Sequence, residues 1–502
     1  MKASGSGFPD DQVLTNLNSA AKKNSISSSY SSNTLASFLS RLEYKFNNRY
    51  LLTLNFRADG SSQFGPDKRW GYFPSGAVAW IITEENFMKD YSNIVSYLKL
   101  RGSVGKTGSQ NLGAYDWRTL MGSATYNGAA GIVPSSLGND ILQWEEQIQK
   151  EVGLDYGFWD DRIRGTLGYY QKKVDNLLYS DPVPTSSSFS SVYQNIGSLK
   201  NRGIEFDVRV DIIKNVQKDL TWNVDFNIAR NRTTLEKLNS SDGYFGGGAY
   251  DYFKIEEGGE TGRFYGYKDA GRLFMTNEEL VGLKTIDPKT GTLKYYRDDY
   301  NYERQGDVYI MDLDGDGQIT ADGDRTVIGN ANPDFFGGFG STLYWKGLML
   351  NAVFSYSVGG DRFWDEEKNS SGDMNVYNTS NRILDSWTVN PGVNASYPRA
   401  MYYGWGSNSI ITDRYIHDAS YLRMTALNLS YRLPKHLYKN SILNAVEFTF
   451  QATNLFTWTK YPGMDPQGNF STTYSAFYNM GIDYSTYPSA RTYNFGIKLT
   501  LK

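Results

Sequence analysis

The segment IEFDVRVDI at residues 204–212 alternates apolar and polar side chains over nine positions. The segments LTWNVDFNI at 220–228 and YNFGIKLTL at 493–501 repeat this pattern. Successive side chains of a strand point to opposite faces, so each segment predicts a strand with one apolar and one polar face. Strands in ordinary sheets average about 5–6 residues, whereas a tilted membrane crossing needs about 9–11. These lengths therefore favour the strands of a membrane barrel.

Further strands and their links extend the pattern along the chain. Residues 38–46 and 50–58 predict a first hairpin, joined by a tight turn at Asn47-Asn48. Counting such segments gives roughly 14 strands. Other short links, Asp160-Asp161 and Trp345-Lys346-Gly347, alternate with long ones at 232–262, 272–334 and 361–419. This alternation predicts an all-β fold, a large antiparallel transmembrane β-barrel with long extracellular loops.

Composition narrows the class of protein. The 502 residues include no cysteine, which excludes a disulfide scaffold and thiol catalysis. The net charge of −3 gives no indication of nucleic-acid binding. No apolar run is long enough for a transmembrane helix. The 39 tyrosines and 11 tryptophans suit the aromatic girdles of a barrel, and they equally suit a sugar-binding β protein.

The segment DLDGDGQITADGD at 312–324 has the spacing of a calcium-binding loop. Carboxylates at alternate positions of a tight turn bring oxygen ligands to one point, which suits a hard cation. Glycine occupies the twelfth position, so a neighbouring aspartate has to replace the usual glutamate. The expected ligands are Asp312, Asp314, Asp316, Gln318 through its carbonyl, and Asp322 or Asp324. We predict a structural Ca2+ here, without flanking helices; the alternative is a solvated acidic turn.

Several motifs carry a resemblance to a known family. They are DLDGDGQI (312–319), DRTVIGN (324–330), NPDFFGGFG (332–340), SYSVGGDRFW (355–364), the run 57–80, and the runs 420–434 and 448–466. In this order they resemble the SusC/RagA-like TonB-dependent outer-membrane transporters. The resemblance covers nearly the whole chain, from about Phe8 to the C-terminus.

The resemblance implies a barrel of about 22 strands filled by a plug. On this reading residues 1–36 are a polar loop or linker, and 37–502 form the C-terminal part of the barrel. Because the strand count falls short of this number, the plug and the first strands are expected to lie outside this chain. No apolar segment of a signal peptide follows Met1, which by itself means either a cytoplasmic protein or a chain without its true N-terminus. The implied location is the outer membrane of a Gram-negative bacterium of the Bacteroidetes type, where lipid surrounds the barrel. The implied partners are the missing N-terminal portion, a SusD-like surface lipoprotein and, through the absent plug and TonB box, TonB–ExbB–ExbD.

The resemblance also implies a function, the import of oligosaccharides or peptides. Aromatic residues of the long loops are candidates for stacking on a sugar ring or packing against the lipoprotein. These residues are Tyr244, Phe245, Tyr250, Tyr252, Trp364, Tyr402, Tyr403 and Trp405. The alternative for each is packing against its neighbours.

No catalytic motif stands out, and we expect no enzyme. Neither His417 nor His436 accompanies a nucleophile elbow. The acidic pairs 84–85, 145–146 and 366–367 lack a glycosidase context. Two alternatives to the importer remain open at this point: a passive porin-type barrel, and a soluble all-β glycan-binding or adhesin module.

Overall fold

The computed structural model describes most of the chain. The described residues are 2–7, 22–27, 30–126, 129–215, 217–238, 244–245, 252–275, 284–286, 293–295, 305–316, 318–372, 379–389, 391–392, 395–400, 408, 410–439, 442–468 and 480–501. Among them, no helix is both long enough and apolar enough to cross a membrane.

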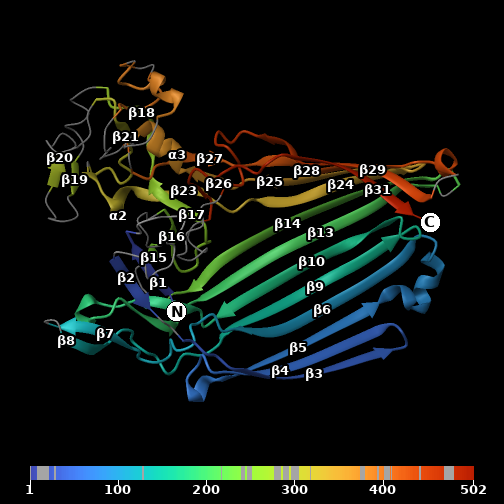
Figure 1. Cartoon of the computed structure of the whole chain (residues 1–502), viewed down its shortest axis with the longest axis horizontal. Coiled ribbons are helices and arrows are strands. Elements are labelled where there is room, and N and C mark those ends of the chain that lie inside the picture. Colours follow the sequence, from blue (N-terminus) through green and yellow to red (C-terminus); the bar gives the residue numbers. More distant parts are fainter. Residues whose placement is uncertain are drawn as a thin grey trace.

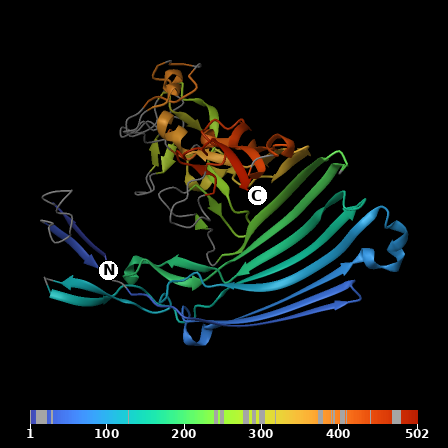
Figure 2. The same cartoon turned by 45° about the vertical axis from the view of Figure 1, so that its right-hand side comes forward.

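Thirteen antiparallel strands form one large curved sheet (Figures 1 and 2). In spatial order they are β3 (Leu35–Phe46), β4 (Tyr50–Ser61), β5 (Trp70–Ile81), β6 (Val95–Ser109), β9 (Glu145–Phe158), β10 (Ile163–Asp175), β13 (Ser198–Asn215), β14 (Leu220–Lys237), β24 (Phe335–Trp345), β25 (Leu348–Val358), β28 (Tyr421–Arg432), β29 (Leu443–Thr459) and β31 (Thr492–Leu501). Each strand pairs with those before and after it in this series. The predicted antiparallel architecture of long strands is therefore confirmed.

The sheet has one strand fewer than expected, because the links expected at 232–262 and 272–334 are a single connection between β14 and β24. The segments between them form β17 (Arg263–Tyr267) and β18 (Asp269–Leu273), which pair outside the large sheet. Their partners are β23 (Arg325–Asn330) and β21 (Val308–Ile310).

The outer face of the sheet is apolar and exposed, and the inner face is polar. On β31, Phe495 and Ile497 are 82% and 65% exposed, and they pair with Phe450 and Phe448 of β29. Asn494, which has the opposite orientation, pairs with Gln451. Large apolar side chains in contiguous rows require an apolar surrounding, as lipid provides for a barrel. The two faces predicted from the alternation are thus confirmed.

Tight turns join the strands at one end of the sheet. Asn47 and Asn48 both have positive φ, 48° and 57°, as do Asp160 and Asp161, at 56° and 57°. Positive φ at both central residues matches the right-handed twist of the flanking strands and is common for asparagine and aspartate. At the same end, β5 and β6 are joined by two 3-10 helices, η3 (Ile82–Glu84) and η4 (Asn86–Tyr91).

The other end of the sheet carries the long connections. Two of them contain hairpins, β7 (Met121–Tyr126) with β8 (Ala129–Pro134), and β11 (Leu178–Pro182) with β12 (Ser191–Asn195). The N-terminal segment differs from the loop expected over 1–36. Within it, β1 (Lys2–Ser6) pairs with β2 (Lys22–Ser27). This pairing satisfies backbone hydrogen-bonding groups, and the polar composition of the segment does not indicate it.

Three long connections fold together into one body, which we call the loop module. It comprises the described residues of 252–334, 359–420 and 460–491, and it lies at the end of the sheet opposite the tight turns (Figure 1). A single apolar core contains residues of all three connections. The core residues are Tyr252, Phe253, Phe264, Ala331, Phe363, Tyr415 and Ile482.

Several short elements complete the loop module. They are β16 (Lys254–Ile255), β22 (Gln318–Ile319), α2 (Ala321–Asp324), β26 (Asp361–Trp364), α3 (Asp365–Glu367), the π-helix η6 (Lys368–Gly372), η7 (Asn381–Asp385), η8 (Asp413–Tyr415), β27 (Ile416–Asp418) and β30 (Ile482–Asp483). Strand β26 pairs with both β27 and β30, so the second connection is hydrogen-bonded to the third. Two-residue β15 (Tyr244–Phe245) pairs with β16, while β19 (Lys284–Ile286) pairs with β20 (Leu293–Tyr295) and β22. At the tight-turn end, η9 (Lys435–Tyr438) links β28 to β29.

Candidate functional site

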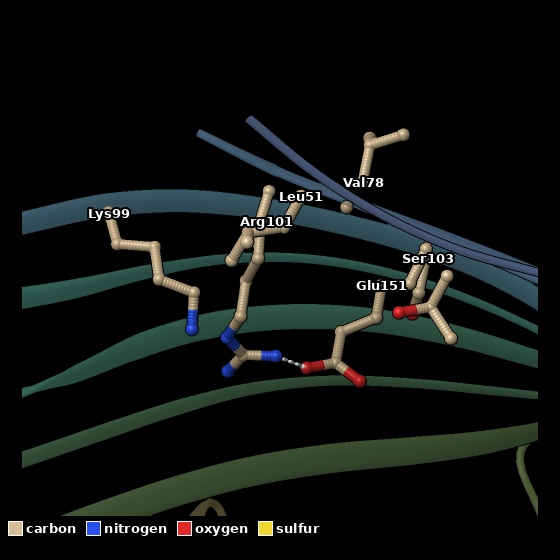
Figure 3. Close-up of a pocket in the computed structure, with 10 residues that line it drawn as sticks. Leu51, Val78, Lys99, Arg101, Ser103 and Glu151 are labelled. Atoms are coloured by element: carbon tan, nitrogen blue, oxygen red, sulfur yellow. Dashed lines mark hydrogen bonds and ion pairs between the residues drawn. The ribbon is translucent and has the colours of Figure 1, made fainter. Parts of the chain in front are cut away.

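Charged side chains on the inner face of the sheet form ion pairs. Arg101 pairs with Glu151 and with Asp155, whose Oδ1 lies 3.1 Å from Arg101 Nε. Lys99 Nζ lies 3.0 Å from the second oxygen of Asp155. Lys99, Arg101 and Glu151 line a pocket on the wall and point to the same side of the sheet, whereas Val78 points to the other side (Figure 3). This part of the wall is hydrophilic with its charges paired.

Farther round the sheet, the inner face carries amide side chains. Asn351 Nδ2 donates to Thr342 Oγ1 over 2.9 Å, and Asn428 Nδ2 donates to Asn351 Oδ1 over 2.9 Å. In register with Asn428, Gln451 and Asn494 continue the row on β29 and β31. Amides donate and accept hydrogen bonds without charge. This row is suited to uncharged polar solutes such as sugar hydroxyls or peptide groups.

Buried polar contacts join the first two connections of the loop module. Asp307 is 1% exposed, and Arg399 contacts both of its oxygens, with Nε 2.7 Å from Oδ1 and Nη2 3.1 Å from Oδ2. Asn408 Nδ2 donates to Asp307 Oδ1 over 2.7 Å. A second pair, Arg414 Nε to Asp269 Oδ2 at 2.8 Å, links the same two connections. Bidentate arginine–carboxylate contacts fix geometry as well as charge.

A hydrogen-bonded group surrounds Glu367 of α3. His417 Nε2 lies 2.5 Å from Glu367 Oε2, Arg382 Nη1 donates to Oε1 over 2.9 Å, and the Tyr397 hydroxyl donates to Oε1 over 3.3 Å. The Arg382 guanidinium also lies 4.5 Å from the ring centre of Trp364. Burial and the nearby Glu367 carboxylate raise the pKa of Tyr397. Neither this group nor a partner for His417 could be predicted from the sequence, because only the fold brings its members together.

The predicted calcium loop brings three carboxylates together. One ligand atom from each of Asp312, Asp314 and Asp324 lies within 4.8 Å of the others. Asp324 is fully buried, and its two oxygens accept from the backbone nitrogens of Leu313, over 2.8 Å, and Thr320, over 2.6 Å. Burial, together with the charges of the two other aspartates, raises the pKa of Asp324. This donor set fits a hard cation.

The other predicted ligands are Asp316, Asp322 and Gln318. Asp316 and Asp322 are exposed and do not join the three clustered carboxylates, and the side chain of Gln318 lies outside the described part of the structure. Of the two aspartates offered as a replacement at the twelfth position, Asp324 is the one in the cluster. No EF-hand helix follows the loop, because its last four residues form the single turn α2 and strand β23 begins directly after them at Arg325. Thr320 caps α2 by accepting from Gly323 N over 2.9 Å.

Two of the eight aromatic candidates can be placed, and both are packed inside the loop module. Tyr252 is 4% exposed and its hydroxyl donates to Asp365 Oδ1 over 2.8 Å. Trp364 is 8% exposed, with Arg382 over its ring and His417 and Tyr461 nearby. Neither ring has an open face for a sugar, so the packing alternative applies to both. The side chains of Tyr244, Phe245, Tyr250, Tyr402, Tyr403 and Trp405 lie outside the described part of the structure.

Comparison with known proteins bears on this architecture. The family model described as "TonB dependent receptor-like, beta-barrel" matches residues 3–455. The chain belongs to the TonB-dependent receptor family. It is 33% identical over 495 residues to TonB-dependent receptor P3 of Formosa agariphila, a match that covers 94% of this chain and 46% of that protein. It is 32% identical over 483 residues to TonB-dependent receptor SusC of Bacteroides thetaiotaomicron, covering 93% of this chain and 44% of SusC.

Solved structures agree with this assignment to the TonB-dependent receptors. A chain in a structure titled "Structure of the RagAB peptide transporter" superposes with a TM-score of 0.77 at 27% identity, covering 98% of this chain and 51% of that one. This TonB-dependent receptor chain therefore spans about half the length of the relatives that it matches. The predicted SusC/RagA-like barrel and its outer-membrane location are confirmed, and the soluble all-β module is excluded. TonB-dependent transporters are not enzymes.

Proposed function

We propose that this chain forms part of the wall of a SusC-like transporter that imports oligosaccharides or peptides across the outer membrane. The observation that carries the proposal is the polar inner face of a membrane sheet, with paired charges on β6 and β9 and uncharged amides on β25 to β31. Hydrophilic solutes of some size need such a wall. Import then needs binding and gating but no covalent chemistry by the chain's own residues.

The open edges of the sheet support a larger barrel. Among the described residues, β3 and β31 each pair on one side only. Unpaired strand edges cannot face lipid, because their backbone groups would lack hydrogen bonds. We propose that further strands close the sheet, to about 22 in all, around a plug that TonB–ExbB–ExbD displaces.

The loop module supports a partner on the extracellular side. Its shared core and buried ion pairs give a fixed surface over one end of the wall. We propose that a SusD-like lipoprotein caps the barrel there and delivers the solute. The test is tagged purification of the intact protein from outer membranes in mild detergent. A stoichiometric lipoprotein is expected in the eluate, and its absence under conditions that preserve the folded barrel would remove this part of the proposal.

Energy coupling separates an importer from a passive porin, which is the alternative. Uptake of labelled oligosaccharides and of labelled peptides is measured in cells with and without the gene, and again after the proton gradient is collapsed. An importer loses uptake of its solute in both cases. A porin loses it only when the gene is deleted. The solute class that shows the double dependence identifies the substrate.

We also propose that Ca2+ binds between Asp312, Asp314 and Asp324 and stiffens this part of the loop module. Three converging carboxylates, one of them held by two backbone donors, support the proposal. The role is structural, because the bound ion would tie the turn at 312–316 to α2. Isothermal titration of the intact, chelator-treated protein with Ca2+ is the test, and absence of saturable heat would reject it.

A further inference from the structure

The outward residues of five adjacent strands change from apolar to basic toward the extracellular end. On β9, the outward residues from Phe158 to Val152 are apolar, and the next outward residue is Lys150. On β13 the change comes between Ile204 and Arg202, and on β14 it comes at Arg230. On β6 and β10 the corresponding residues are Lys106 and Lys173.

Strand register places three of these cations on the outer face. Lys150 pairs with Val104, which is 50% exposed on the outer face, and with Gln171. Gln171 in turn pairs with Arg202. Directly paired residues share a face of the sheet, so Lys150 and Arg202 lie on the outer face. Arg230 pairs with Ile204, which is 50% exposed, and has the same orientation.

The basic residues farther from the apolar rows are already neutralised. Lys106 Nζ lies 2.6 Å from Glu146, and Lys173 Nζ lies 3.0 Å from Asp175. Lys200 Nζ lies 3.4 Å from Glu236. Arg232, the next outward residue on β14, pairs with Asp334 at 3.0 Å and lies near Glu260. Each of these four basic residues beyond the apolar rows therefore has an acidic partner.

Lys150, Arg202 and Arg230 differ from these paired basic residues. All three are exposed, and within the described part of the chain none of them makes an ion pair. We name these three residues the basic arc. On the other side of the sheet, the outward residues at the same ends of β24, β25 and β29 are apolar, as at Phe335, Val358 and Trp458. The positive charge is therefore confined to one sector of the wall.

Position and charge together indicate the ligand. Unpaired cations at the border of an apolar band lie where lipid headgroups meet the protein, and basic residues there attract anionic lipid. Arginine and lysine both bind phosphate well, and Gln171 adds a neutral donor between two members of the arc. We propose that the basic arc binds phosphate groups of lipid in the outer leaflet, which holds anionic lipid against this sector of the barrel.

Native mass spectrometry of the intact protein, purified in a non-ionic detergent, tests the proposal. The probes are phosphatidic acid and the diacylglycerol with the same acyl chains, which differ only in the phosphate. We expect wild type to retain phosphatidic acid and to release diacylglycerol. Each single variant, Lys150→Gln, Arg202→Gln or Arg230→Gln, is expected to lose about fivefold of its affinity for phosphatidic acid, and the triple variant roughly a hundredfold.

A matched control removes the same charge at the other end of the wall. Lys89, Lys218 and Lys439 are exposed and lie near the tight turns, so the triple Lys→Gln variant there should retain phosphatidic acid as wild type does. Equal retention by the basic-arc variant and wild type would overturn the proposal. Equal loss in the control variant would show that net charge alone explains the effect, and this result would also overturn the proposal. Displacement of phosphatidic acid by inorganic phosphate at equal concentration would indicate a site for free anions instead of lipid.

Two checks guard against misfolding. Heat-modifiable migration on a denaturing gel reports whether the barrel of each variant has formed. The double variant Arg202→Lys, Arg230→Lys keeps the charges with less change in shape, and it should retain the preference for phosphatidic acid. Loss of that preference in a correctly folded Lys variant would contradict a role for positive charge.

Discussion

Arg423 Nη2 lies 2.6 Å from Asp465 Oδ1, and the two side chains are only 5% and 7% exposed. Arg423 belongs to β28 of the membrane sheet, whereas Asp465 belongs to the connection between β29 and β31. The same guanidinium donates to Thr457 Oγ1 over 2.9 Å and to Gln467 Oε1 over 2.6 Å. A buried arginine of the wall therefore holds the third connection in place.

Removal of that arginine should loosen the third connection. Arg423→Gln leaves the Asp465 carboxylate buried without its cation, which typically costs about 3–5 kcal/mol. We expect residues 460–468 to exchange backbone hydrogen much faster, as measured by hydrogen–deuterium exchange with mass spectrometry. The matched control is Arg41→Gln, which breaks the exposed pair between Arg41 and Glu43 and should cost less than about 1 kcal/mol. Unchanged exchange in Arg423→Gln would contradict the attachment.

The same pair predicts a dependence on pH. Burial alone would raise the pKa of Asp465, but hydrogen bonds from Gln467 N and Arg423 hold it below its ordinary value of 3.8. The unfolded carboxyl therefore takes up a proton first as the pH falls. The stabilisation is complete above that ordinary value and is lost as the pH falls through the folded value. The difference in protection between wild type and Asp465→Asn should be constant from about pH 8 to 5 and shrink below about pH 4. A difference that shrinks near neutral pH would contradict a lowered pKa of Asp465.

Stabilisation by Ca2+ should depend on the three clustered carboxylates and not on every aspartate of residues 312–324. Asp314→Asn removes a member of the cluster, so the rise in thermal stability on adding Ca2+ should be lost or much reduced, as read by differential scanning fluorimetry. Asp316→Asn removes the same charge two residues away and should leave most of the rise intact. Equal loss in both variants would favour the larger ligand set predicted from the spacing, in which Asp316 also binds the ion.

The shared core should make the three connections loosen together. Phe264 is fully buried among residues from all of them, and truncation to alanine typically costs about 3–5 kcal/mol. We expect Phe264→Ala to raise hydrogen exchange in 252–275, 359–372 and 410–420 alike. Leu384→Ala, at a side chain that is 61% exposed, is the control and should change little. A rise confined to 252–275 would show that the connections move separately.

Local pattern predicted the sheet but not the loop module. Alternation over 204–212 and 220–228 is a property of each strand alone, and contact with lipid on one face and water on the other imposes it. Strand β17, with its aromatic residues, has strand-forming composition too, and only its pairing with β23 shows that it leaves the membrane sheet.

The Glu367–His417 contact joins residues 50 positions apart, which no local pattern can indicate. For Asp324 the sequence supplies part of the answer, because it offers Asp322 or Asp324 for the twelfth position. Only the fold shows that Asp324 is the buried one, with its oxygens accepting from backbone nitrogens of the loop.

Thiol labelling tests most directly that this sheet is a membrane wall with lipid outside and water inside. These 502 residues contain no cysteine, so labelling above that of the unsubstituted protein reports the introduced thiol. Neighbours on one strand face opposite ways, which gives the matched pairs Phe206→Cys with Asp207→Cys and Phe226→Cys with Asp225→Cys. In lipid nanodiscs, a charged maleimide is expected to label Asp207→Cys and Asp225→Cys and to spare both phenylalanine positions. Equal labelling at Phe206→Cys and Asp207→Cys in folded protein would contradict the account.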